Sequence, residues 1–285
     1  MQWSDLTSRP KPQPDAQITY GDDPLQHVDL WLPKGKALHP VVLMVHGGCW
    51  QTDIAVASLM NHIAGDLRAR GIAVWNIEYR GVDRPGGGYP GTFRDAGTAA
   101  DALRSHARHY RLKISNVVAF GHSAGGHLAL WLAARERIPK SSALHVAHPL
   151  KISTAIAIGG LPDLKAAATP PGDTCGVEAV NKLTGKPSAK RPDVYRDTSP
   201  PEMLPFTAHQ VLINASLDTI APPSFADAYQ LRAKAHGIAV RRVIVPGEGH
   251  VELVAPGTAS WAAELREIER ALHLQPTSLP EARDR

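Results

Sequence analysis

The chain has 285 residues, 43% of them hydrophobic, and a formal net charge of +4 at pH 7. This length fits one large α/β domain or two small ones, with enough apolar material for a sizeable core. No apolar run reaches the roughly 18 residues that a membrane span needs. Basic residues are scattered among acidic ones without interleaved aromatic residues, so we expect neither nucleic acid nor a membrane as a partner.

The amino terminus and the cysteines bear on the cellular compartment. The first residues lack the charged-then-apolar pattern of an export signal. The two cysteines, Cys49 and Cys175, are too few for a disulfide framework. We therefore expect a cytoplasmic protein whose two thiols are reduced.

The first predicted element is an amino-terminal arm. Residues 1–16 contain three prolines and few apolar side chains, which predicts an extended arm. Two short segments, 18–20 and 27–32, flank a turn and predict an antiparallel hairpin. We expect a single domain over residues 17–273 and a frayed tail over residues 274–285.

The centre of the chain alternates between strands and helices. Continuous apolar runs are typical of strands that are covered on both faces. Such runs predict strands at 40–45, 72–77, 117–120, 152–158, 210–215 and 239–245. Helical patterns lie between them at about 55–70 and 92–110, after residue 123, and at about 223–236 and 258–273. This alternation indicates an α/β fold, with a mostly parallel sheet and helices on both faces.

The alternation stops between residues 161 and 208. This segment is rich in proline and glycine and only weakly periodic. We expect an irregular cap insertion with short helices, lying over the carboxyl edge of the sheet.

The sequence GHSAG at residues 121–125 matches the G-x-S-x-G pattern between a predicted strand and a predicted helix. A serine at such a sharp turn has strained backbone angles, and its hydroxyl stands out at the carboxyl end of the sheet. The glycines are required because a Cβ would collide with the turn or with the neighbouring strand. We interpret Ser123 as a nucleophile; the alternative is a tight turn with a surface serine.

A serine nucleophile needs a base and an orienting acid. In this architecture they follow the serine in the order acid, then histidine, each on a loop after a strand. Asp218 and His250 occupy those loops, so we assign them as orienting acid and general base. Asp163 and Glu248 are the rival acids, and an aspartate before two prolines can also serve only as a turn former.

The sequence HGGCW at residues 46–50 follows a central strand and can turn backbone N–H groups inward. Such groups stabilise the negative charge of a tetrahedral intermediate. We expect Gly48, Cys49 and Ala124 to form the oxyanion hole, with His46 bracing the loop and Cys49 as a small pocket-lining thiol. The alternative is a tight turn that binds no ligand.

Other side chains are candidates for the substrate pocket or for metal binding. Trp50 and Tyr89 lie on carboxyl-edge loops, and His122 precedes the serine, so we assign all three to the pocket. His106 and His109 share a helix face but have no acidic or cysteine partner, so we expect no metal site.

The motifs together resemble a known group of proteins. HGGCW at 46–50, EYR at 78–80 and GHSAGGHLA at 121–129, with Asp218 and His250, resemble the α/β-hydrolase superfamily. More narrowly, they resemble the branch of kynurenine-formamidase-like proteins and small-ester carboxylesterases, over residues 17–273.

This resemblance implies an α/β-hydrolase fold and the hydrolysis of a small ester or amide through an acyl-enzyme, without metal or organic cofactor. It places the family's triad on Ser123, Asp218 and His250, and the oxyanion loop on Gly47, Gly48 and the next residue. That next position is often tyrosine or glycine in relatives and is cysteine here.

Three hypotheses about function follow. The first is a serine carboxylesterase acting on short-chain esters. The second is an arylformamidase that cleaves N-formyl-kynurenine with the same residues. The third is a non-catalytic binding protein on a hydrolase fold. In each case the partner is a small molecule, and the sequence leaves the oligomeric state open.

Overall fold

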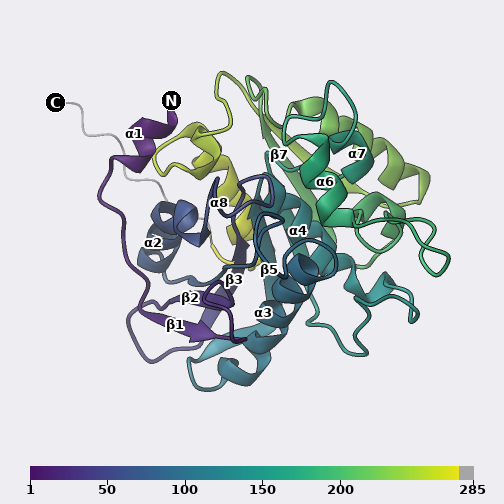
Figure 1. The fold of residues 1–285 in the computed structure, drawn as a ribbon. Coiled ribbons are helices and arrows are strands. Elements are labelled where there is room, and N and C mark those ends of the chain that lie inside the picture. The colour runs from purple at the N-terminus through teal and green to yellow at the C-terminus, as the bar shows by residue number, and fades with distance from the viewer. Residues whose placement is uncertain (276–285) are drawn as a thin grey trace.

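The computed structural model describes residues 1–275 and contains one eight-stranded sheet (Figure 1). Its strands are β1 (Ala16–Thr19), β2 (His27–Trp31), β3 (His39–Val45), β4 (Ala73–Ile77), β5 (Leu112–His122), β6 (Thr154–Ile158), β7 (His209–Ala215) and β8 (Val240–Val245). The strand order is β1-β2-β4-β3-β5-β6-β7-β8. Only the pairs β1–β2 and β2–β4 are antiparallel, so the predicted hairpin and mostly parallel sheet are confirmed.

The register of the parallel strands brings their carboxyl ends to one edge of the sheet. Val45 pairs with Gly121 across β3 and β5, and His122 pairs with Ile158 across β5 and β6. The loops after these strands therefore meet where ligands bind in open α/β sheets.

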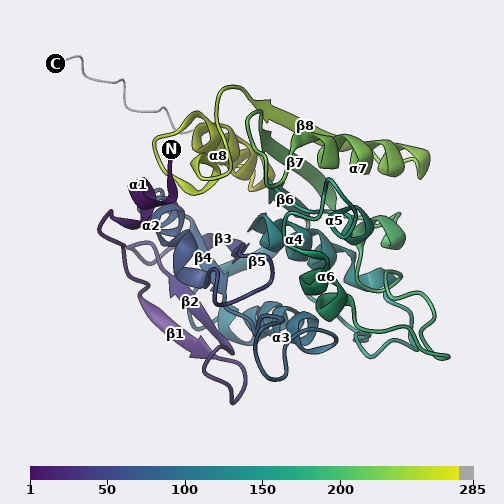
Figure 2. The same ribbon diagram turned by 45° about the horizontal axis from the view of Figure 1, so that its top comes forward.

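Helices cover both faces of the sheet (Figure 2). The helices are α2 (Asn61–Ala69), α3 (Gly91–Ala107), α4 (Ala124–Ala134), α7 (Pro223–Ala235) and α8 (Ala259–Ala271). The 3-10 helices are η1 (Ala57–Met60) before α2, η2 (Arg135–Arg137) after α4 and η4 (Glu252–Val254) before α8.

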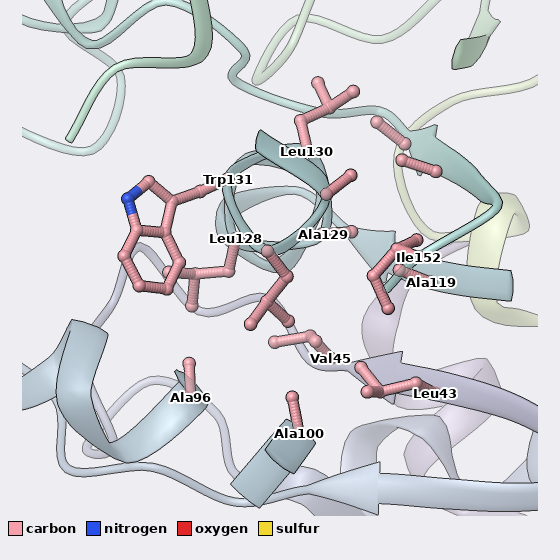
Figure 3. Packing of buried hydrophobic residues seen from close by; sticks show 14 of the residues in the cluster. Leu43, Val45, Ala96, Ala100, Ala119, Leu128, Ala129, Leu130, Trp131 and Ile152 are labelled. Carbon is pink, nitrogen blue, oxygen red and sulfur yellow. The ribbon is translucent and has the colours of Figure 1, made fainter. Parts of the chain in front are cut away.

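The core is split by the sheet into two apolar clusters. Leu43 and Val45 of β3 belong to the cluster that includes residues of α3, α4 and α7, while Val42 and Met44 belong to the cluster that includes α2 and α8. Successive side chains of a strand point to opposite faces, so a buried parallel strand must be apolar throughout. Figure 3 shows Leu43 and Val45 facing the side chains of α3 and α4.

Between β6 and β7 the chain forms three short helices. They are α5 (Leu164–Ala167), α6 (Val177–Thr184) and the 3-10 helix η3 (Pro200–Met203). Irregular backbone joins them, as the proline and glycine content of residues 161–208 predicts.

The prediction of a wholly extended arm is wrong. Trp3–Thr7 form a short helix, α1, which lies beside α2 (Figure 1). Its Leu6 is only 1% exposed and belongs to the apolar cluster that includes α2. Burial of this one leucine stabilises the helix. A single apolar residue is too little to show a helical period in the sequence. Of the predicted tail, residues 276–285 lie outside the described residues.

Candidate active site

Ser123 joins the end of β5 to the start of α4 with an unusual backbone conformation. Its φ of 54° and ψ of −120° are costly for a residue with a side chain. The surrounding backbone holds it there, because its N–H donates to the Ile158 carbonyl at 2.9 Å and its carbonyl accepts from Gly126 at 2.9 Å. The strained turn predicted from the sequence is therefore present.

The glycines on either side of the serine are sterically required. A Cβ on Gly121 would lie 2.0 Å from the carbonyl oxygen of Gly125. A Cβ on Gly125 would lie 2.2 Å from the carbonyl oxygen of Val45 in β3. The first collision is with the turn and the second with the adjacent strand, as the sequence argument predicts.

Asp218 and His250 meet at the same edge of the sheet. Oδ2 of Asp218 lies 2.7 Å from Nδ1 of His250, and both side chains are buried. Oδ1 of Asp218 accepts from the backbone N–H groups of Ile220 and Ala221, each at 2.9 Å. Because a carboxylate accepts, Nδ1 of His250 donates, which leaves Nε2 as the free base.

The two rival acids have other structural roles. Asp163 accepts from the backbone N–H of Lys165 and caps α5. Glu248 accepts from the N–H groups of Ala259 and Ser260 at the start of α8, at 2.8 and 2.7 Å. Carboxylates at helix amino termini satisfy N–H groups that lack partners within the helix.

Ser123 and His250 line one cavity of about 320 Å³. His122, assigned to the pocket from the sequence, lines it too, as do Gly48 and Cys49 of the predicted oxyanion loop. The remaining lining residues are Trp3, Thr7, Ile54, Ala55, Leu59 and Ile220. The structure thus brings together the predicted nucleophile and base, which are far apart in the sequence.

The loop after β3 presents its backbone to this cavity. Gly48 and Cys49 have φ values of 98° and 52°, so the chain turns in the left-handed region. Within residues 1–275, the N–H groups of the three predicted donors, Gly48, Cys49 and Ala124, have no hydrogen-bond acceptor. Free N–H groups of this kind can bind a developing oxyanion.

His46 and Glu78 brace that loop from below, and both are buried. Nε2 of His46 lies 2.9 Å from Oε1 of Glu78, and its Nδ1 lies 2.7 Å from the carbonyl oxygen of Gly47. Both partners are oxygen acceptors, so each ring nitrogen of His46 faces a group to which an N–H can donate. Burial alone would raise the pKa of Glu78, but the charge and hydrogen bond of His46 and two backbone donors hold it below its usual value. The bracing role expected for His46 fits this geometry.

Cys49 is not a free thiol. It forms a disulfide with Cys175, which lies in the segment between β6 and β7. The prediction of reduced cysteines is therefore wrong, because a count of two says nothing about the distance between two loops. Folding brings the two Cα atoms within 5.2 Å although 126 residues separate them in the sequence. This cross-link ties the loop after β3 to the cap insertion.

Trp50 and Tyr89 do not line the Ser123 cavity, contrary to their assignment. Trp50 is fully buried, and its Nε1 donates to Nδ1 of His127 at 3.2 Å. Tyr89 donates to Asp197 at 3.1 Å and faces a different cavity. Trp50 is packed in the core and Tyr89 contacts a different cavity, and loop position alone predicts neither outcome.

Two buried histidines near the site are neutral. Burial, and then the neighbouring His250, lower the pKa of His122 well below its usual value. Burial likewise lowers the pKa of His127 to about 4. His127 accepts from Trp50 through Nδ1, so its Nε2 carries the proton and donates to the Thr198 carbonyl at 2.8 Å. It thereby joins α4 to the loop after β3 and to the cap.

Sequence reasoning missed much of the cavity wall. Ile54 and Leu59 lie just beyond the predicted oxyanion loop, and Ile220 lies two residues after Asp218. Trp3 is the one aromatic residue in the polar, proline-rich arm, and this was the available signal.

Residues 1–275 contain no group of three or more histidine, cysteine or acidic side chains that could hold a metal ion. Their helices include none that is both long and apolar enough to cross a bilayer.

Comparison with known proteins identifies the family. The model of the BD-FAE family matches residues 28–229, more than half of the chain. The chain belongs to the BD-FAE family. This is an α/β-hydrolase esterase family, so the predicted superfamily is confirmed, whereas the kynurenine-formamidase-like branch is not. The BD-FAE match includes Ser123 and Asp218 and ends before His250.

Individual relatives are similar to this BD-FAE chain over different lengths. Esterase LipC of Mycobacterium tuberculosis is 27% identical over 82% of this chain and 59% of its own length. A probable isoprenylcysteine alpha-carbonyl methylesterase of Arabidopsis thaliana, ICMEL1, is 31% identical over 44% of this chain and 25% of its own. The chain therefore spans less than two thirds of either relative.

A solved structure supports the fold. Esterase B from Lactobacillus rhamnosis has a TM-score of 0.76 and is 18% identical, over 95% of this chain and 91% of its own. At this identity the likeness concerns the fold, which is that of an α/β-hydrolase.

Proposed function

We propose that the protein is a carboxylesterase that cleaves small esters through an acyl-enzyme on Ser123. The observation that carries this proposal is the shared cavity, where Ser123 at its strained turn and His250 bonded to Asp218 both face the same space. The esterase relatives agree with the reaction class.

In the first half of the reaction, Oγ of Ser123 attacks the carbonyl carbon while Nε2 of His250 takes the hydroxyl proton. Asp218 stabilises the resulting imidazolium. The N–H groups of Gly48, Cys49 and Ala124 bind the oxyanion. The intermediate then breaks its bond to the alcohol, which leaves with the proton from His250.

In the second half, a water molecule attacks the acyl-enzyme carbonyl and His250 takes a proton from it. The second intermediate breaks its bond to Ser123, whose oxygen recovers the proton from His250. The acid leaves, and no oxidant, metal or cofactor is needed for the balance. The cavity lining is mostly apolar and favours esters with short apolar groups.

The test is hydrolysis of p-nitrophenyl acetate by the wild type and by Ser123→Ala. We expect kcat of the variant to fall by several orders of magnitude, because removal of one triad residue abolishes most of the rate enhancement that the triad provides. Ser105→Ala changes an exposed serine on α3 and serves as the control, with a wild-type rate. Equal rates for wild type and Ser123→Ala would refute the proposal.

The formamidase hypothesis has no observation of its own in its favour. It uses the same residues, so the substrate decides. A panel that adds formanilide and N-formyl-kynurenine separates the two, and we expect the esters to be hydrolysed faster.

A further inference from the structure

Helix α1 of the amino-terminal arm forms one wall of the Ser123 cavity. Trp3 and Thr7 of this helix line the cavity together with Ser123 and His250. The Trp3 ring meets the rings of His122 and His250 edge to face, with centroid distances of 6.3 and 6.4 Å. The indole therefore stands directly beside the predicted general base.

Much of the remaining cavity wall is apolar. Ile54, Ala55 and Leu59 come from the segment between β3 and α2, and Ile220 comes from the loop that carries Asp218. Among residues 1–275, no acidic or lysine side chain lines the cavity, so the part of a ligand that fits there is uncharged and apolar. Burial of methylene groups against such a wall stabilises the bound ester.

The arm that carries α1 is attached along α2. The Leu6 side chain is buried beside that helix. Nδ2 of Asn61 donates to the Pro12 carbonyl at 3.0 Å, and Arg68 donates to the Gln13 carbonyl at 3.1 Å and pairs with Asp15 at 3.0 Å. Six residues of the arm and α2 thus hold the wall without help from Trp3.

Trp3 itself is 37% exposed, so one side of the indole faces solvent while the other faces the cavity. We expect removal of the indole to widen the cavity toward solvent, while the buried Leu6 still holds α1 against the core.

We propose that Trp3 is a specificity-determining residue that limits the length of the apolar group of the ester. This inference rests on the proposed esterase function and names the part of the substrate that the cavity selects. With the indole in place, a group longer than the cavity meets the ring. Without it, longer groups extend past α1.

The experiment compares the wild type with Trp3→Ala, Trp3→Phe and the control Leu231→Ala, which changes an exposed apolar residue on α7. One substrate series lengthens the acyl chain from p-nitrophenyl acetate to octanoate. The other lengthens the alcohol in alkyl acetates. In Trp3→Ala we expect the ratio of kcat/KM for the longest to the shortest substrate to rise about tenfold or more in one series.

The series that shifts shows which half of the ester lies under α1. Trp3→Phe should lie between wild type and Trp3→Ala, and Leu231→Ala should match the wild type. Two results in the folded Trp3→Ala variant would overturn the inference while the esterase function stands. One is a kcat/KM ratio equal to that of the wild type in both series. The other is a fall in kcat/KM that is the same for all chain lengths. Absence of ester turnover by the wild type would overturn the proposed function, and this inference with it.

Discussion

At the scale of single residues, the pairing of Asp218 with His250 sets which ring nitrogen is free. An Asp218→Asn substitution keeps an oxygen for the N–H groups of Ile220 and Ala221 but directs an amide NH₂ at Nδ1 of His250. This favours the tautomer with the proton on Nε2, which cannot accept from Ser123. We expect kcat for p-nitrophenyl acetate to fall by about 10³ to 10⁴, with little change in the melting temperature.

Asp163→Asn is the matched control for this substitution. Asp163 is one of the two rival acids in the sequence, and it caps α5. Its variant should keep a kcat near that of the wild type. An Asp218→Asn enzyme within twofold of the wild type would remove Asp218 from the mechanism.

At the scale of elements, the disulfide joins the loop after β3 to the segment before α6. The link closes a long stretch of chain, and such links stabilise chiefly by restricting the unfolded state, by about 2–5 kcal/mol. Cys175→Ser breaks the link without changing a residue of the loop at residues 46–50. We expect urea to unfold this variant at a lower concentration, and kcat to fall as Cys49 loses its anchor.

Reductant and thiol titration check the same point. Dithiothreitol should lower the unfolding midpoint of the wild type and leave that of Cys175→Ser unchanged. The unreduced, denatured wild type should show no reactive thiol. Two titratable thiols, together with an unfolding midpoint that does not change on addition of dithiothreitol, would contradict the disulfide. The disulfide also removes one support for the predicted cytoplasmic location, because reducing compartments keep cysteine thiols reduced.

At the scale of the whole molecule, the parts that could be predicted are those with a repeated physical signal. Strands such as β3 are apolar on both faces, and the turn at Ser123 needs glycines within a few residues of one another. The predicted meeting of serine, acid and histidine follows from the parallel sheet, because the loops after its strands lie at one edge.

The parts that could not be predicted depend on contacts between distant segments. The disulfide joins residues 126 positions apart. The cavity wall combines α1 with the loops around Ile54 and Ile220, each too short to show a pattern. Trp50 and Tyr89 were misplaced because the direction of a loop side chain depends on neighbours such as His127 and Asp197.

The central claim is that the Ser123 oxygen is an activated nucleophile, and covalent labelling tests it most directly. A fluorophosphonate probe should add one phosphonyl group to the folded wild type, with loss of fluoride, in the peptide that contains Ser123. Intact-mass and peptide spectra should show no adduct on Ser123→Ala or on the denatured wild type. An unlabelled folded wild type, or an adduct on another residue, would contradict the account.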